Sequence, residues 1–202
     1  MNNPKNVKVG DKIFPINTDF RIALKCNEIA MDENIGDFER ALAIIYLLFG
    51  EKGLNATEIY DKLIELSVRY ISLGRENNGL KSKYESEKYQ LDFTKCEGLI
   101  KSSFKYDYGY DPYELEYLHW YDFYNDLENL SSSELGDCCI LSRVNTILHR
   151  NPSEIKNSKD RQKLIDTQRD LAEKYCIDNR PKATKEQQES ARRLYESLGI
   201  KI

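Results

Sequence analysis

The chain has 202 residues, 32% of them charged, and a formal net charge of −4. This length predicts one domain with a buried core. The mildly acidic composition argues against a dedicated nucleic-acid binder, which would carry a basic patch. The charge is uneven, since residues 142–202 carry 14 Lys or Arg against 9 Asp or Glu, whereas residues 1–141 carry 16 against 25. Acids alternate with the bases of the C-terminal part, which is typical of a solvated helical face.

Neither a secretion signal nor a membrane span is predicted. The first residues are polar, and the longest apolar run, residues 41–49, is shorter than the roughly 18 residues that span a bilayer. The five cysteines are odd in number and include no C-x-x-C pair. We interpret them as reduced core thiols of a cytosolic protein.

The N-terminal pattern predicts a β-hairpin over residues 7–17, because two short apolar runs flank Gly10-Asp11. Helical spacing begins directly afterwards. Thr18 is predicted to cap the first helix, with Asp19 in its first turn.

Nearly every later segment has helical periodicity. Asp37 is predicted to open a helix that carries Phe38 on its apolar face and ends at Gly50. Asn55 and Glu58 have the spacing of a capping box before the next helix. Further helices are predicted after residue 90, after Asp111, after Ser131 and before Pro181. The sequence therefore predicts a mainly α, bundle-like domain of seven or eight helices over residues 1–178, with the N-terminal hairpin, an exposed loop at 74–90 and a C-terminal helical extension at 179–202.

One segment concentrates aromatic side chains: ten of the 22 Phe, Tyr and Trp residues lie between 104 and 124. Asp111, Pro112 and Glu114 give a strong helix-start signal, which predicts that an aromatic helix opens there. We expect this helix to be central and its large side chains to be buried. The predicted core residues are Phe20, Phe104, Leu118, His119, Trp120 and Phe123.

The tyrosine-rich residues around this helix start are a candidate partner-binding surface. Tyrosine combined with Asp and Gly in a turn is typical of surfaces that bind another protein. A platform for stacking nucleic-acid bases is the alternative, but the acidic surroundings would repel phosphate. The candidates are Tyr106, Tyr108, Tyr110, Tyr113 and Tyr117.

Arg143 interrupts an otherwise apolar helix face. A buried arginine needs a carboxylate, which Asp92, Asp111 or Glu116 could supply in a fold-specifying ion pair. Alternatively, Arg143 anchors a protein interface, where arginine is enriched.

Catalytic motifs are scarce. The sequence has no phosphate-binding loop, dinucleotide fingerprint, nucleophile elbow or H-E-x-x-H zinc motif. His119 with Asp122 and Asp126 could hold a metal or act as a general base, but packing of His119 in the aromatic cluster is the favoured interpretation. We predict no catalytic residue, no metal and no cofactor.

Three segments together resemble the gene-product-fifteen family of long-tailed phages and prophages of Gram-positive bacteria. They are Ile16 to Arg21 (INTDFR), Asp92 to Asp111, and Leu118-His119-Trp120 followed by Phe123, Leu127, Leu130 and Arg143. The resemblance covers most of residues 7–176. Tyr121 departs from the family, which often repeats a Trp there, and the stretch after Arg180 resembles a chain-specific extension.

The resemblance implies a non-enzymatic role in tail assembly, because family genes usually precede the gene for the tape measure protein. By analogy with tail assembly chaperones, the expected partners are the tape measure and tail-tube proteins. Self-association is expected too, whereas binding to a membrane or to nucleic acid is not. The expected location is the host cytoplasm during assembly, with no copy in the mature virion. The alternative is a structural tail or baseplate adaptor of the virion.

Overall fold

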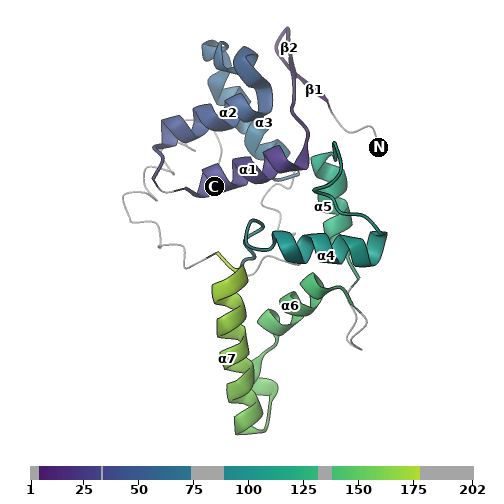
Figure 1. Ribbon diagram of the computed structural model, residues 1–202. Coiled ribbons are helices and arrows are strands. Elements are labelled where there is room, and N and C mark those ends of the chain that lie inside the picture. Colours follow the sequence, from purple (N-terminus) through teal and green to yellow (C-terminus); the bar gives the residue numbers. More distant parts are fainter. Residues whose placement is uncertain (1–4, 33, 74–88, 132–137, 178–202) are drawn as a thin grey trace.

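The computed structural model describes residues 5–32, 34–73, 89–131 and 138–177, and it confirms the mainly α fold with a small N-terminal β-hairpin. Seven α-helices lie within these ranges. The hairpin and the first three helices occupy one end, the last two helices occupy the other, and α4 and α5 lie between them (Figure 1). The predicted extension, 179–202, and nearly all of the predicted loop lie outside the described residues, so that division of the chain stays a prediction.

The predicted hairpin forms from β1 (Asn6–Val9) and β2 (Lys12–Pro15), which pair antiparallel. Its apolar face meets the helices, because Phe14 is only 1% exposed and its ring lies 6.3 Å from that of Phe49. Lys52 adds a 2.6 Å hydrogen bond to the Ile13 carbonyl. The hairpin is therefore pinned to the helix behind it.

The first three helices pack against one another and bury a continuous apolar stripe. They are α1 (Phe20–Met31), α2 (Asp37–Leu54) and α3 (Tyr60–Ile71), with a short 3-10 turn, η1 (Thr57–Ile59), before α3. The Arg40 guanidinium on α2 closes the end of α1 by donating to the carbonyls of Ile29 (3.2 Å) and Asp32 (2.5 Å). This contact supplies donors for carbonyls that the C-terminal end of a helix otherwise leaves without them.

Four details of this group differ from the sequence-based expectation. The cap of α1 is Asp19, whose side chain accepts from the Arg21 amide. Gly50 is non-helical, with φ +65°, so regular helical geometry stops where the sequence predicted, but a second helical segment follows directly and carries α2 on to Leu54. Phe38 was expected on the apolar face and is 68% exposed. The predicted capping box fails because the Glu58 carboxylate pairs with Lys12 of the hairpin.

The largest correction concerns the aromatic helix. α4 (Glu97–Tyr108) ends at Gly109, whose φ of +75° is a left-handed helix cap. The next helix, α5 (Trp120–Glu128), begins eight residues later than the Pro112 signal indicates. Residues 112–116 form turns and a bend instead. The expectation of a helix that begins at Pro112 is wrong.

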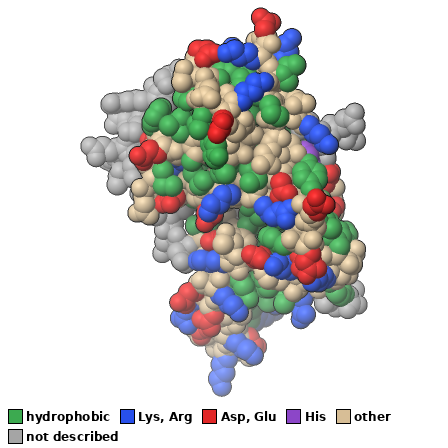
Figure 2. Space-filling view, turned by 45° about the horizontal axis from the view of Figure 1, so that its top comes forward, with side chains coloured by type: hydrophobic (Ala, Val, Ile, Leu, Met, Phe, Trp, Pro, Cys, Tyr) green, Lys and Arg blue, Asp and Glu red, His purple; other side chains and the backbone are tan. Residues whose placement is uncertain are grey.

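The last helices are α6 (Ile140–His149) and α7 (Ser158–Tyr175), with the 3-10 turn η2 (Pro152–Glu154) at the predicted break. The buried Gln168 side chain joins them by donating to the carbonyls of Ile147 (2.9 Å) and Arg150 (2.7 Å) at the end of α6. Acidic and basic side chains alternate over the projecting α7 end (Figure 2).

The centre of the core is a stack of aromatic rings at the junction of α1, α4 and α5. The Phe123 ring lies 4.2 Å from that of Phe20, 5.5 Å from that of Phe104 and 6.0 Å from that of Trp120. These four side chains are at most 1% exposed, and Leu118 is half-buried beside them. The stack joins the N-terminal group of helices to the central pair, α4 and α5.

Candidate partner-binding surface

The start of α1 and the start of α5 lie side by side, although they are far apart in the sequence. Asp19 and His119 form an isolated antiparallel bridge. The Phe20 amide donates to the Leu118 carbonyl at 3.0 Å, and the Trp120 amide donates to the Thr18 carbonyl at 2.8 Å. We call this junction, residues 17–21 with 115–121, the clasp.

Each of the two segments of the clasp contains a residue that caps a helix. Asp19 Oδ1 accepts from the Arg21 amide at 2.9 Å, and His119 Nδ1 accepts from the Tyr121 amide at 3.0 Å. Because Nδ1 accepts, it carries no proton. His119 is 4% exposed. It is therefore the N-cap of α5, a role that the sequence interpretation of a packing residue missed.

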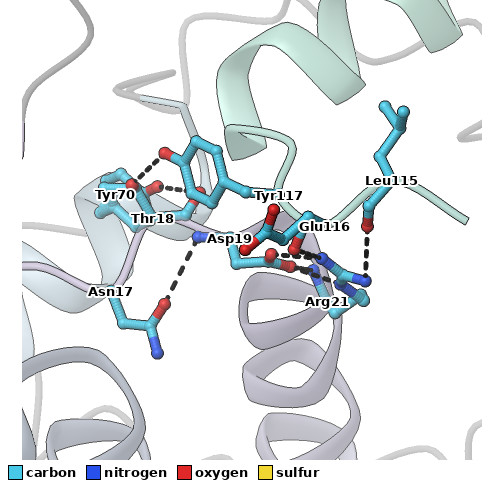
Figure 3. A network of polar contacts seen from close by, with 8 residues as sticks. All are labelled: Asn17, Thr18, Asp19, Arg21, Tyr70, Leu115, Glu116 and Tyr117. Atoms are coloured by element: carbon cyan, nitrogen blue, oxygen red, sulfur yellow. Dashed lines mark hydrogen bonds and ion pairs between the residues drawn. The ribbon is translucent and has the colours of Figure 1, made fainter. Parts of the chain in front are cut away.

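Arg21 fastens the segment before α5 to the start of α1 (Figure 3). Its guanidinium lies 2.6 Å from the Asp19 carboxylate and donates to the carbonyls of Leu115 (3.1 Å) and Glu116 (2.9 Å). Hydrogen bonding to Asp19 raises the pKa of Arg21. A guanidinium group has five N–H donors, so one arginine can donate to all three acceptors at once.

Tyr117 is held by its hydroxyl while much of its ring stays in solvent. The hydroxyl lies 2.5 Å from Oγ1 of the buried Thr18, whose carbonyl also accepts from the Tyr70 hydroxyl at 3.4 Å (Figure 3). Burial raises the pKa of Tyr70, so that hydroxyl stays a donor. The Tyr117 side chain is nevertheless 48% exposed.

Tyr108 and Tyr110 are held in the same way by α5. The Tyr108 hydroxyl donates to the Asp126 carbonyl at 2.8 Å, and the Tyr110 hydroxyl donates to the Asp126 carboxylate at 2.6 Å. Their rings stack 6.1 Å apart. Burial and the Asp126 hydrogen bond raise the pKa of Tyr110.

The five tyrosines expected to bind a partner therefore divide by exposure. Tyr106 is 63% exposed and Tyr108 37%. Tyr113 is half-buried, with its ring edge-on to that of Phe20 at 5.1 Å. Tyr110 is half-buried as well and packs against the core. We call the exposed set, with a neighbouring leucine, the tyrosine surface: Tyr106, Tyr108, Leu115 and Tyr117.

Arg143 stands apart from this surface. It is exposed on α6, so the expectation that it is buried in an ion pair is wrong. Asp111, one of the carboxylates considered for it, pairs instead with Lys105 at 3.2 Å. Its role as an interface anchor stays a prediction.

In the described ranges, no group of three His, Cys, Asp or Glu side chains is arranged to hold a metal ion. Cys26 and Cys96 are fully buried, and burial raises the pKa of each thiol to about 12. Such thiols are protonated at neutral pH and are therefore poor nucleophiles.

A family model described as bacteriophage Gp15 protein matches residues 2–173, which is most of the chain. The chain belongs to the bacteriophage Gp15 family. This confirms the resemblance seen in the sequence. The family places the chain among structural or tail-related phage proteins, which are not known as enzymes. No curated protein and no solved structure matches it.

The two most specific segments of the Gp15 resemblance meet in space. The INTDFR segment and the Leu118-His119-Trp120 segment are the two sides of the clasp. Their pairing explains why both motifs occur in one chain, since each supplies the backbone partners of the other. Within the described part of the Gp15 protein, no helix is long and apolar enough to cross a membrane.

Sequence reasoning missed the residues that tether the tyrosines. Asp126 had been considered only as a metal or acid-base group, and Thr18 only as a helix cap. Tyr70 carried no signal beyond its place on an apolar stripe. Their roles depend on contacts across 16, 99 and 52 positions of the chain, which no local pattern encodes.

Proposed function

We propose that this Gp15 protein is a non-enzymatic tail assembly chaperone that binds the tape measure and tail-tube proteins during tail morphogenesis. The observation that carries the proposal is the tyrosine surface, where the side chains of Tyr108 and Tyr117 are exposed although their hydroxyl groups are fixed to the scaffold. An aromatic ring that stays exposed to water contributes none of the free energy that its burial would provide.

Fixed, exposed rings favour binding to another protein. Ordering a free side chain on association costs about 0.5–1.5 kcal/mol, and a ring that is already held avoids much of this cost. Tyr108, Tyr110 and Tyr117 are each held by a hydroxyl hydrogen bond. The surface is thus prepared for contact without rearrangement of the backbone.

The local charge favours a protein partner over nucleic acid. The Asp126 carboxylate lies 2.6 Å from the Tyr110 hydroxyl, and Asp107 lies in the same helical turn as Tyr106 and Tyr108. Carboxylates at this position repel phosphate. A largely helical client such as the tape measure protein would offer apolar side chains at helical spacing instead.

The test is co-expression with the tape measure protein of the same phage or prophage, followed by affinity purification and titration of the complex. Tyr117→Ala should weaken binding at least tenfold, which corresponds to about 1.4 kcal/mol. Arg143→Ala tests the predicted second anchor. The matched control is Tyr46→Ala, which removes a tyrosine of similar exposure (51% against 48%) from α2. Equal effects of Tyr117→Ala and Tyr46→Ala, or no co-purification by the unaltered chain, would rule out the proposed surface.

A structural tail or baseplate adaptor is the alternative function. Mass spectrometry of purified virions separates the two, because a chaperone confined to the host cytoplasm is missing from the particle and an adaptor is present at fixed stoichiometry. The proposed self-association is measured separately by sedimentation of the purified chain over a range of concentrations.

A further inference from the structure

A groove of about 150 Å³ opens between α1 and the segment that leads into α4. Leu24, Phe93 and Tyr113 supply its apolar surface, and all three are half-buried. A cavity of this volume accepts a group the size of a benzene ring. The groove can thus receive one large apolar side chain.

The charged residues on the rim are already paired with neighbouring charges. Lys25 pairs with Glu28 at 2.7 Å on α1, and Glu97 pairs with Lys101 at 2.5 Å on α4. An occupant therefore needs no matching charge. These features fit the apolar edge of an amphipathic helix.

The described chain ends beside this groove. The Asp92 amide donates to the Tyr175 carbonyl at 2.9 Å, and the Ile177 amide donates to the Gln90 carbonyl at 3.0 Å. Residue 177 is thereby fixed against the strand-like segment that continues into Phe93. Whatever follows residue 177 starts within a few residues of the groove wall.

The following residues have the pattern that the groove requires. Ala191, Leu194, Tyr195 and Leu198 are spaced 3, 1 and 3 apart, which places them on one face of a helix. Leu194 lies 17 residues beyond Ile177, and such a length can span up to about 56 Å. The connection is therefore long enough for Leu194 to reach the groove.

We propose that residues 184–199 of the same chain dock in this groove as an amphipathic helix, with Leu194 seated between Leu24 and Phe93 and Leu198 one turn further along the same apolar stripe. Tethering favours this occupant over a separate molecule. A short flexible linker gives an effective concentration on the order of millimolar, so even an intrinsic affinity of about 1 mM half-fills the groove. The inference is independent of whether the chain binds a tape measure protein.

Hydrogen exchange of the full-length chain, followed by mass spectrometry of peptides, tests the proposal. In the Leu194→Asp/Leu198→Asp variant, amides of residues 21–28 and 93–97 should exchange several-fold faster than in the unaltered chain, as should those of 186–199. Ser190→Asp/Ser197→Asp adds the same charge beside the apolar stripe and should change neither set. In the reverse direction, Phe93→Ser should accelerate exchange in 186–199.

Two outcomes would overturn the inference. In the first, the amides of residues 186–199 exchange in the unaltered chain as fast as those of an unstructured peptide, and neither double variant changes the exchange rates of the groove amides. The other is protection of the groove that falls on dilution, which would assign the occupant to a second copy of the chain.

Discussion

Replacing Phe123 by alanine should remove the central contact between α1 and the pair α4 and α5. The Phe123 side chain is 0% exposed and its ring faces three others, from α1, α4 and α5. Truncation leaves a cavity that none of these rings can fill without giving up its own packing. The loss therefore includes both transfer and cavity terms.

The expected loss of unfolding free energy is about 4 kcal/mol, since buried Phe→Ala changes cost about 3–5 kcal/mol. Loss of three aromatic pairs keeps it from falling in the lower part of that range. With a urea m-value of about 2 kcal/mol/M, the unfolding midpoint should fall by about 2 M. Phe123→Leu retains most of the volume and should lose no more than about 1.5 kcal/mol.

The assay is urea unfolding followed by circular dichroism and by the fluorescence of Trp120, the single tryptophan, which is 1% exposed. Phe38→Ala is the matched control, because Phe38 is 68% exposed and its truncation should change stability by less than about 0.5 kcal/mol. If Phe123→Ala loses less than about 1 kcal/mol, or no more than Phe38→Ala, the ring stack is not the centre of the core.

Three further outcomes are expected. On α4, Gly98→Ala should stabilise the protein by about 0.5 kcal/mol, since an added Cβ meets nothing within 4 Å. At the end of α4, Gly109→Ala should destabilise it by about 1 kcal/mol, because φ is +75° there. The two variants should therefore shift Tm in opposite directions. Gln168→Leu should destabilise by about 1–3 kcal/mol by leaving carbonyls at the end of α6 without a donor, while the exposed Gln162→Leu should leave Tm unchanged. Burial raises the pKa of Cys26 from 9.0 to about 12, so this thiol ionises at lower pH in the unfolded chain than in the folded one. Its contribution to stability is therefore lost as the pH rises from 9 to 12. At pH 8, a thiol reagent should label Cys26 only in denaturant.

The sequence predicted the elements whose signals are local. The hairpin around Gly10 and the apolar stripes of the helices depend on neighbouring residues, and the structure has both. Gly50 shows the limit of such signals, because a left-handed glycine can end a helix or kink it, and only the packing of the residues beyond it decides.

The false helix start at Pro112 has a specific physical cause. Asp111 Oδ1 accepts from the Tyr113 amide at 2.9 Å, a bond that an Asx turn and a helix cap share. The carbonyls of Leu115 and Glu116, which a helix would use internally, are taken by Arg21 from 94 and 95 positions away. The tyrosines of the candidate site could be named from composition, but the fixing of their hydroxyls by Thr18 and Asp126 could not.

The clasp also sets an order of events during synthesis. Asp19 and His119 are 100 positions apart, and closing a loop of that length costs about 3 kcal/mol more chain entropy than closing a four-residue turn. Until the ribosome has delivered residues 118–123, the start of α1 lacks its backbone partners and Phe20 lacks the ring that covers it. A nascent chain that stops before this point carries an uncovered aromatic side chain. Premature release there should yield an aggregation-prone fragment rather than a smaller working domain.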